Sequence, residues 1–140
     1  MRSPSRTFRQ THTSKTVANL PYAYKGLIDT LEVLARDSDG QVEALKTFFD
    51  WIEEVDPDFN VDELALDFND FVLLLPQVVA AGLISPAAAR SVEAVDNQLD
   101  QMSGEENAEL WTVTALRTSP EWTKVRELAR NALGLFKTSR

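Results

Sequence analysis

Apolar side chains recur every three or four residues from Pro21 onward, and the strict alternation of a half-buried strand is almost absent. This spacing is typical of amphipathic helices. It predicts helices over residues 21–36, 41–55, 61–75, 86–102, 106–117 and 120–137, with a short segment between Pro76 and a capping Gly82. The expected fold class is therefore all-α, an irregular bundle of about six to seven helices in a single domain.

Helix-start and helix-stop residues mark several of these boundaries. The Ser-Pro pairs at residues 85–86 and 119–120 each combine a capping hydroxyl with a proline at the first helical position. Asn60 and Glu63 are spaced as a capping pair for the third helix. Pro76 should end or kink that helix, because it lacks a backbone N–H.

The apolar faces of these helices are expected to form the core. In the helix that begins at residue 86, the apolar residues alternate between spacings of four and three, which indicates a narrow seam against a neighbouring helix. The residues expected to be buried in the third, fourth and last long helices are Leu64, Phe68, Phe71 and Leu75; Ala88, Val92, Val95, Leu99 and Met102; and Trp122, Val125, Ala129, Ala132 and Phe136.

The composition limits the kinds of catalytic and metal-binding site that the chain can form. The chain has 140 residues, of which 44% are apolar and 26% charged, with no cysteine and one histidine, His12. A disulfide framework, a thiolate nucleophile, a histidine-dependent triad and the usual zinc and di-iron sites are therefore excluded. The five glycines are scattered and form no phosphate-binding loop. We expect no catalytic residues, no metal ligands, no cofactor and no enzyme activity.

The chain also lacks the usual targeting signals. No apolar run approaches the ~20 residues that a membrane span needs. Residues 1–16 lack the apolar segment of a secretory signal. The expected location is cytoplasmic, without binding to a membrane.

Charge is distributed unevenly. Residues 1–16 carry four basic residues and no acid, and we expect them to form a flexible basic arm before a helical domain of residues 17–140. Since the whole chain has a net charge of −8, the domain carries −12. Binding of nucleic acid is not expected from such a domain, because phosphates are recognised by clustered Lys and Arg.

The acidic residues are concentrated between Thr47 and Ala89, where there are nine acids and no base. Glu63, Asp67 and Asp70 share one stripe of the third predicted helix, a spacing at which like charges repel one another. The block is either a solvated face or a docking surface for a basic partner, with two aromatic residues as anchors. The predicted partner-binding residues are Asp50, Trp51, Glu53, Glu54, Asp56, Asp58, Phe59, Asp62, Glu63, Asp67 and Asp70.

Two acidic spacings in this block have metal-like patterns. Residues 56–67 have the length of an EF-hand loop, but Val61 stands where a glycine makes the sharp turn, so we reject a true EF-hand. Asp50-x-x-Glu53 and Asp67-x-x-Asp70 resemble the metal-binding motif of the all-α nucleotide pyrophosphohydrolases, the MazG-like family. That resemblance implies a magnesium-dependent nucleotide hydrolase, although the block contains no Lys or Arg to hold phosphates.

A small, acidic, helical chain without cysteine or a catalytic constellation resembles the bacterial immunity proteins that neutralise basic nuclease toxins. The resemblance is one of class and charge, and it assigns no role to any single residue. It implies a protein that inhibits a basic partner, such as a toxin domain. A helical adaptor or scaffold that oligomerises through apolar helix faces, for example as a homodimer, is the second hypothesis. The magnesium-dependent hydrolase is the third.

Overall fold

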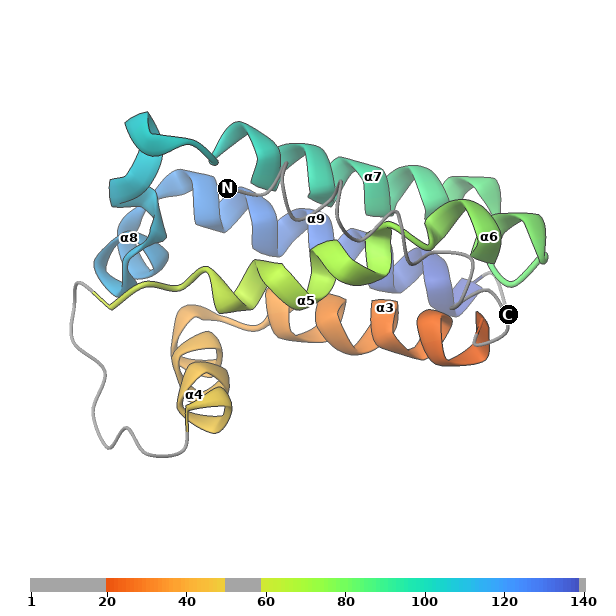
Figure 1. Cartoon of the computed structure of the whole chain (residues 1–140), viewed down its shortest axis with the longest axis horizontal. Coiled ribbons are helices and arrows are strands. Elements are labelled where there is room, and N and C mark those ends of the chain that lie inside the picture. Colours follow the sequence, from red (N-terminus) through yellow and green to blue (C-terminus); the bar gives the residue numbers. More distant parts are fainter. Residues whose placement is uncertain (1–19, 50–58, 139–140) are drawn as a thin grey trace.

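The computed structural model describes residues 20–49 and 59–138, the last two by their backbone alone. These residues form seven α-helices and one 3-10 helix: α3 (Leu20–Ala35), α4 (Ser38–Phe48), α5 (Glu63–Val72), α6 (Leu75–Ala80), α7 (Pro86–Gln101), η2 (Glu105–Trp111), α8 (Val113–Thr118) and α9 (Pro120–Thr138) (Figure 1). The all-α class is confirmed. The predicted basic arm, residues 1–16, lies outside the described residues.

The long helices lie side by side, with α9 packed against both α3 and α7. Helix α5 packs on α3 and also contacts α7, so these four helices enclose the core. Figure 1 shows α4, η2 and α8 at one end of this group and α6 at the other. The acidic helix α5 is therefore a structural member of the bundle, with one face in the core and one outside it.

The predicted seams of α7 and α9 are confirmed, since all ten of their residues are buried. In α5, Leu64 and Phe68 are buried, whereas Phe71 is half-buried. The ring of Phe71 instead packs against Gly26 of α3. A Cβ atom at Gly26 of α3 would lie only 2.2 Å from Cε1 of Phe71, so the absence of a side chain there allows the two helices to pack.

Several predicted boundaries are confirmed in atomic detail. Ser85 and Ser119 each accept a hydrogen bond from the backbone N–H three residues on, at 3.1 and 3.3 Å. Gly82 has a φ of +75° and follows α6. The N–H of Leu83 donates to the carbonyl of Val78 at 3.2 Å, which completes the double hydrogen-bond pattern of a Schellman cap.

Other boundaries differ from the prediction. Helix α4 begins three residues earlier because the carboxylate of Asp37 accepts a hydrogen bond from the N–H of Gly40 at 2.8 Å and caps it. It ends at Phe48, so its predicted continuation to residue 55 is wrong at Phe49, and residues 50–55 lie outside the described part. The helix predicted over residues 106–117 is divided at Thr112, whose extended backbone precedes α8.

The capping pair predicted for the third helix is also wrong. Asp62 is the residue that flanks α5, and its side chain makes no capping hydrogen bond. The side chain of Asn60 accepts from the N–H of Asp62 at 2.6 Å and so stabilises the turn before the helix. At the other end, α5 stops at Val72, and Pro76 is the second residue of α6, where its missing N–H costs no helical hydrogen bond.

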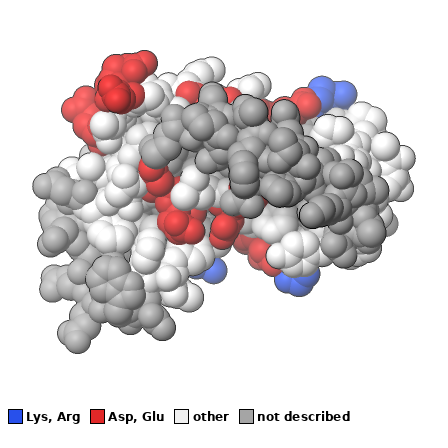
Figure 2. Space-filling view, in the orientation of Figure 1, with Lys and Arg blue, Asp and Glu red and all other residues white. Residues whose placement is uncertain are grey.

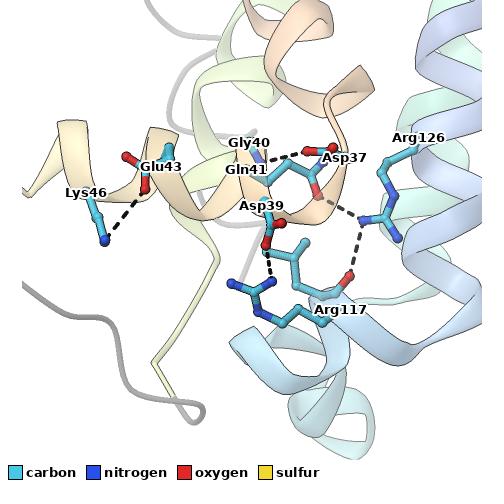
Figure 3. A network of polar contacts seen from close by, with 9 residues as sticks. Asp37, Asp39, Gly40, Gln41, Glu43, Lys46, Arg117 and Arg126 are labelled. Atoms are coloured by element: carbon cyan, nitrogen blue, oxygen red, sulfur yellow. Dashed lines mark hydrogen bonds and ion pairs between the residues drawn. The ribbon is translucent and has the colours of Figure 1, made fainter.

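A buried polar cluster joins α4 to α8 and α9 (Figure 3). Gln41 of α4 is fully buried, and its side chain donates to the carbonyl of Leu34 at 3.0 Å. Arg126 of α9 donates from Nη1 to Oε1 of Gln41 at 2.9 Å and to the carbonyl of Leu116 at 3.1 Å. Burial, and then the charge of Arg130, lower the pKa of Arg126. These bonds fix the start of α4 against α8 and α9.

Candidate partner-binding surface

The residues predicted to bind a partner fall into two groups. Six of them lie outside the described residues: Asp50, Trp51, Glu53, Glu54, Asp56 and Asp58. The other five lie in the segment that leads into α5 and along that helix: Phe59, Asp62, Glu63, Asp67 and Asp70. The structure therefore places the carboxyl-terminal half of the acidic block on α5 and the short segment before it.

Glu63, Asp67 and Asp70 form a stripe on α5, which we call the α5 acidic stripe. Burial is the largest cause that raises the pKa of Glu63, followed by the negative charges of Asp67, Asp70 and Asp62. The three residues of the stripe are therefore close enough to repel one another. Among the described residues, neither Glu63 nor Asp67 forms an ion pair with a Lys or Arg.

Among the described residues, the cations that form ion pairs lie on helices other than α5. Figure 2 shows acidic side chains spread over one face of the molecule, both near its middle and at its upper left edge, with the visible basic side chains toward the edges. The ion pairs of the described residues involve Asp29, Glu43 and Asp39, on α3 and α4. Like charges at helical spacing cost roughly 0.2–0.5 kcal/mol per pair, so the stripe slightly destabilises the isolated helix.

Phe59 was predicted as an aromatic anchor for the partner. It is half-buried, and its ring packs edge-on against that of Phe49, with 5.6 Å between the ring centroids. Much of this ring therefore contacts the protein itself and joins the end of α4 to the segment before α5. Phe48, which precedes Phe49 and is the last residue of α4, is 40% exposed.

Asp62 lies beside the stripe, at the rim of a pocket. Burial is the largest cause acting on Asp62 and raises its pKa, while a side-chain hydrogen bond with Asn60 and a nearby positive charge act in the opposite direction. The pocket has a volume of about 310 Å³ and lies between the start of α5 and the segment that contains η2. Its lining residues are Asn60, Asp62, Ala65, Leu66, Ser103, Gly104, Glu105, Ala108 and Trp111.

The two walls of this pocket are fixed to one another by backbone contacts. The N–H of Val61 donates to the carbonyl of Trp111 at 3.0 Å, and an isolated antiparallel bridge joins Asn60 to Thr112. The indole N–H of Trp111 donates to the carbonyl of Met102 at 2.6 Å, which holds the ring in place. Sequence reasoning missed this pocket, because its walls are separated by about forty residues of chain.

The metal-like spacings have only part of their residues in the described structure. Asp50, Glu53, Asp56 and Asp58 lie outside it, whereas Asp67 and Asp70 are on the α5 acidic stripe. In the described ranges, no group of three or more His, Cys, Asp or Glu side chains is arranged to hold a metal ion. What the described residues offer is a carboxylate-rich surface beside a small pocket.

Comparison of the chain with protein-family models, with curated proteins and with solved structures gives no match. None of the helices in residues 20–49 and 59–138 combines the length and apolar character needed to cross a membrane. The candidate surface therefore rests on its own geometry and charge.

Proposed function

We propose that this protein is a helical binding module that recognises a basic protein partner through the α5 acidic stripe and the surface around it. The observation that carries the proposal is the α5 acidic stripe, in which neither Glu63 nor Asp67 forms an ion pair with a Lys or Arg of the described residues. Carboxylates that repel one another in the free protein gain from the approach of a positively charged surface. Opposed surface potentials also speed encounter and favour the correct partner.

The specific form of binding that we propose is inhibition, in which the acidic surface covers a basic active site. An immunity protein that neutralises a basic toxin is the best example of this form. Its expected signature is protection, because cells that produce the toxin survive when this protein is produced with it. Protection that persists after charge reversal of the α5 acidic stripe would contradict the role of this surface.

Binding can be tested with a defined probe. A fluorescently labelled peptide of alternating Arg and Ser is titrated with the protein, and its anisotropy is measured at several salt concentrations. We expect the affinity to fall as salt rises, because the Debye length shrinks from ~10 Å at 0.1 M ionic strength to ~3 Å at 1 M. An affinity that does not depend on salt would contradict an electrostatic surface.

A pair of variants separates the stripe from the total charge. Asp67→Lys reverses one exposed charge of the stripe, and Glu93→Lys makes the same change in net charge at an exposed position of α7. A unit charge pair at about 4 Å is worth ~1 kcal/mol in water, so reversal at Asp67 should weaken binding by about 5- to 30-fold. The Glu93 variant should bind within about twofold of the unaltered protein. Equal losses in both variants would show that only net charge matters.

A further inference from the structure

The pocket beside the α5 acidic stripe combines two kinds of surface. Ala65 and Leu66 of α5 face Ala108 and Trp111 of η2, so much of the lining is apolar. The carboxylates of Asp62 and Glu105 belong to the same lining, one from each wall. A pocket of about 310 Å³ is at the lower end of the range of small-ligand sites, ~300–1,000 Å³. It suits one long side chain and is too small for a helix.

The pocket is also preorganised. The hydrogen bond between Val61 and Trp111 and the bridge from Asn60 to Thr112 tie the α5 wall to the η2 wall. The ring of Trp111 packs edge-on against Trp122, with 5.2 Å between centroids, so the η2 wall is in turn held against α9. A site whose walls are already in place loses little conformational entropy when a ligand enters.

The charge of the pocket indicates the class of ligand. Among the described residues that line it, two are acids and none is a Lys or Arg. Asp62 is half-buried, and no described cation pairs with it. A positively charged group that enters the pocket would lie against this carboxylate, while an apolar stem would cover Leu66 and Trp111.

We propose that this pocket receives a single arginine side chain of the basic partner, with its stem on the apolar wall and its guanidinium against the carboxylates of Asp62 and Glu105. Arginine fits better than lysine because a guanidinium is planar and weakly hydrated, pairs with carboxylates through several N–H groups and stacks on aromatic rings. The inference rests on the proposed function, since it names the residue by which such a partner would be anchored.

The test compares two small probes on the isotopically labelled protein. N-acetyl-arginine amide and N-acetyl-citrulline amide have nearly the same shape, but citrulline is uncharged. We expect the arginine probe to shift the NMR signals of the Trp111 indole N–H and of the Ala65 and Ala108 amides at millimolar concentration. The citrulline probe should bind about tenfold more weakly, the factor expected for the loss of one charge-assisted hydrogen bond.

Three variants locate the effect. Glu105→Gln removes one carboxylate of the pocket, and Glu106→Gln makes the same change at the next residue, which does not line it. Glu105→Gln should weaken the arginine probe and Glu106→Gln should not. Ala108→Phe, at an exposed position of η2, fills the pocket without changing charge and should abolish the shifts. If this third variant fails to fold, the two glutamine variants still decide the question.

The results separate this inference from the proposed function. Equal shifts with arginine and citrulline, or shifts that survive both Glu105→Gln and Ala108→Phe, overturn the arginine pocket. The basic peptide would then still lose affinity in Asp67→Lys if the proposed function holds. If the proposed function fails instead, the peptide is insensitive to Asp67→Lys while the arginine probe still prefers the pocket over the rest of the surface.

Discussion

Replacing Arg126 tests whether the buried polar cluster stabilises the fold. The Arg126 side chain leaves α9 and reaches Oε1 of Gln41 at 2.9 Å and the carbonyl of Leu116 at 3.1 Å. Gln41 is fully buried and Arg126 is 9% exposed, so water does not readily replace these bonds. Arg126→Met keeps an unbranched apolar stem and removes the donors.

The expected cost follows from the two acceptors that lose their donor. A buried polar group left without a partner costs about 1–3 kcal/mol. Against this, the variant no longer buries a charge, which is the largest cause of the lowered pKa of Arg126. We expect the free energy of unfolding to fall by about 2–4 kcal/mol, a large part of the total for a chain of this size.

Urea denaturation followed by far-ultraviolet circular dichroism measures this change. With a slope near 2 kcal/mol per M, the midpoint should move by about 1–2 M. Arg130→Met is the matched control, because Arg130 also donates to a carbonyl, that of Ala35 at 2.9 Å, but at an exposed position. Water replaces that bond, so the control should lose less than about 1 kcal/mol.

A double variant decides whether Gln41 and Arg126 act together. Gln41→Leu combined with Arg126→Met removes the buried amide as well as the guanidinium, so the loss should be smaller than the sum of the two single losses by about 1–2 kcal/mol. Additive losses, or a single Arg126→Met loss below about 1 kcal/mol, would refute the reasoning that these two side chains satisfy one another.

Three further changes test local features. Gly26→Ala should lower the free energy of unfolding by about 1–3 kcal/mol, measured in urea, because its Cβ would clash with the ring of Phe71. Ser85→Ala should cost about 1 kcal/mol in the same assay through the lost cap of α7. In Glu63, burial and the neighbouring carboxylates raise the folded-state pKa, so the folded protein binds this proton more tightly than the unfolded chain and ionisation destabilises it. Thermal melts of Glu63→Gln should therefore show higher stability than the unaltered protein at pH 7, with the gain vanishing as pH falls below the ordinary value of 4.5.

The features that the sequence predicts here are those that depend on residues within about one helical turn of one another. Ser85 is followed by a proline and caps its helix as expected, because the capping bond reaches only three residues. The seam of α7 is equally local, since helical spacing alone decides which residues share a face. The class of fold and most helix positions follow from such short-range signals.

The features that sequence does not predict depend on contacts across long separations. Gln41 and Arg126 are 85 residues apart, and nothing near either residue marks it as buried. The prediction of one helix over residues 106–117 fails for the same reason. Thr112 is held in an extended conformation where it pairs with Asn60, and this pairing outweighs the local helical pattern. The pocket between these segments could not be read from either alone.

The described basic residues that form ion pairs contact acids outside α5. Among the described residues, Lys25 pairs with Asp29 at 2.7 Å, Lys46 lies 3.6 Å from Glu43, and Arg117 pairs with Asp39, all on acids outside α5.

Exposed ion pairs of this kind contribute only about 0–1 kcal/mol each to the stability of the fold. Their cations lie on α3, α4 and α8 and not on α5. The side chain of Arg126 is buried and donates a hydrogen bond to Gln41, so it also lies away from the stripe. An acidic composition alone would predict carboxylates mixed with the available bases, whereas in the described part of the chain neither Glu63 nor Asp67 forms an ion pair with a Lys or Arg. The basic partner that we propose would supply the positive charge for these two carboxylates.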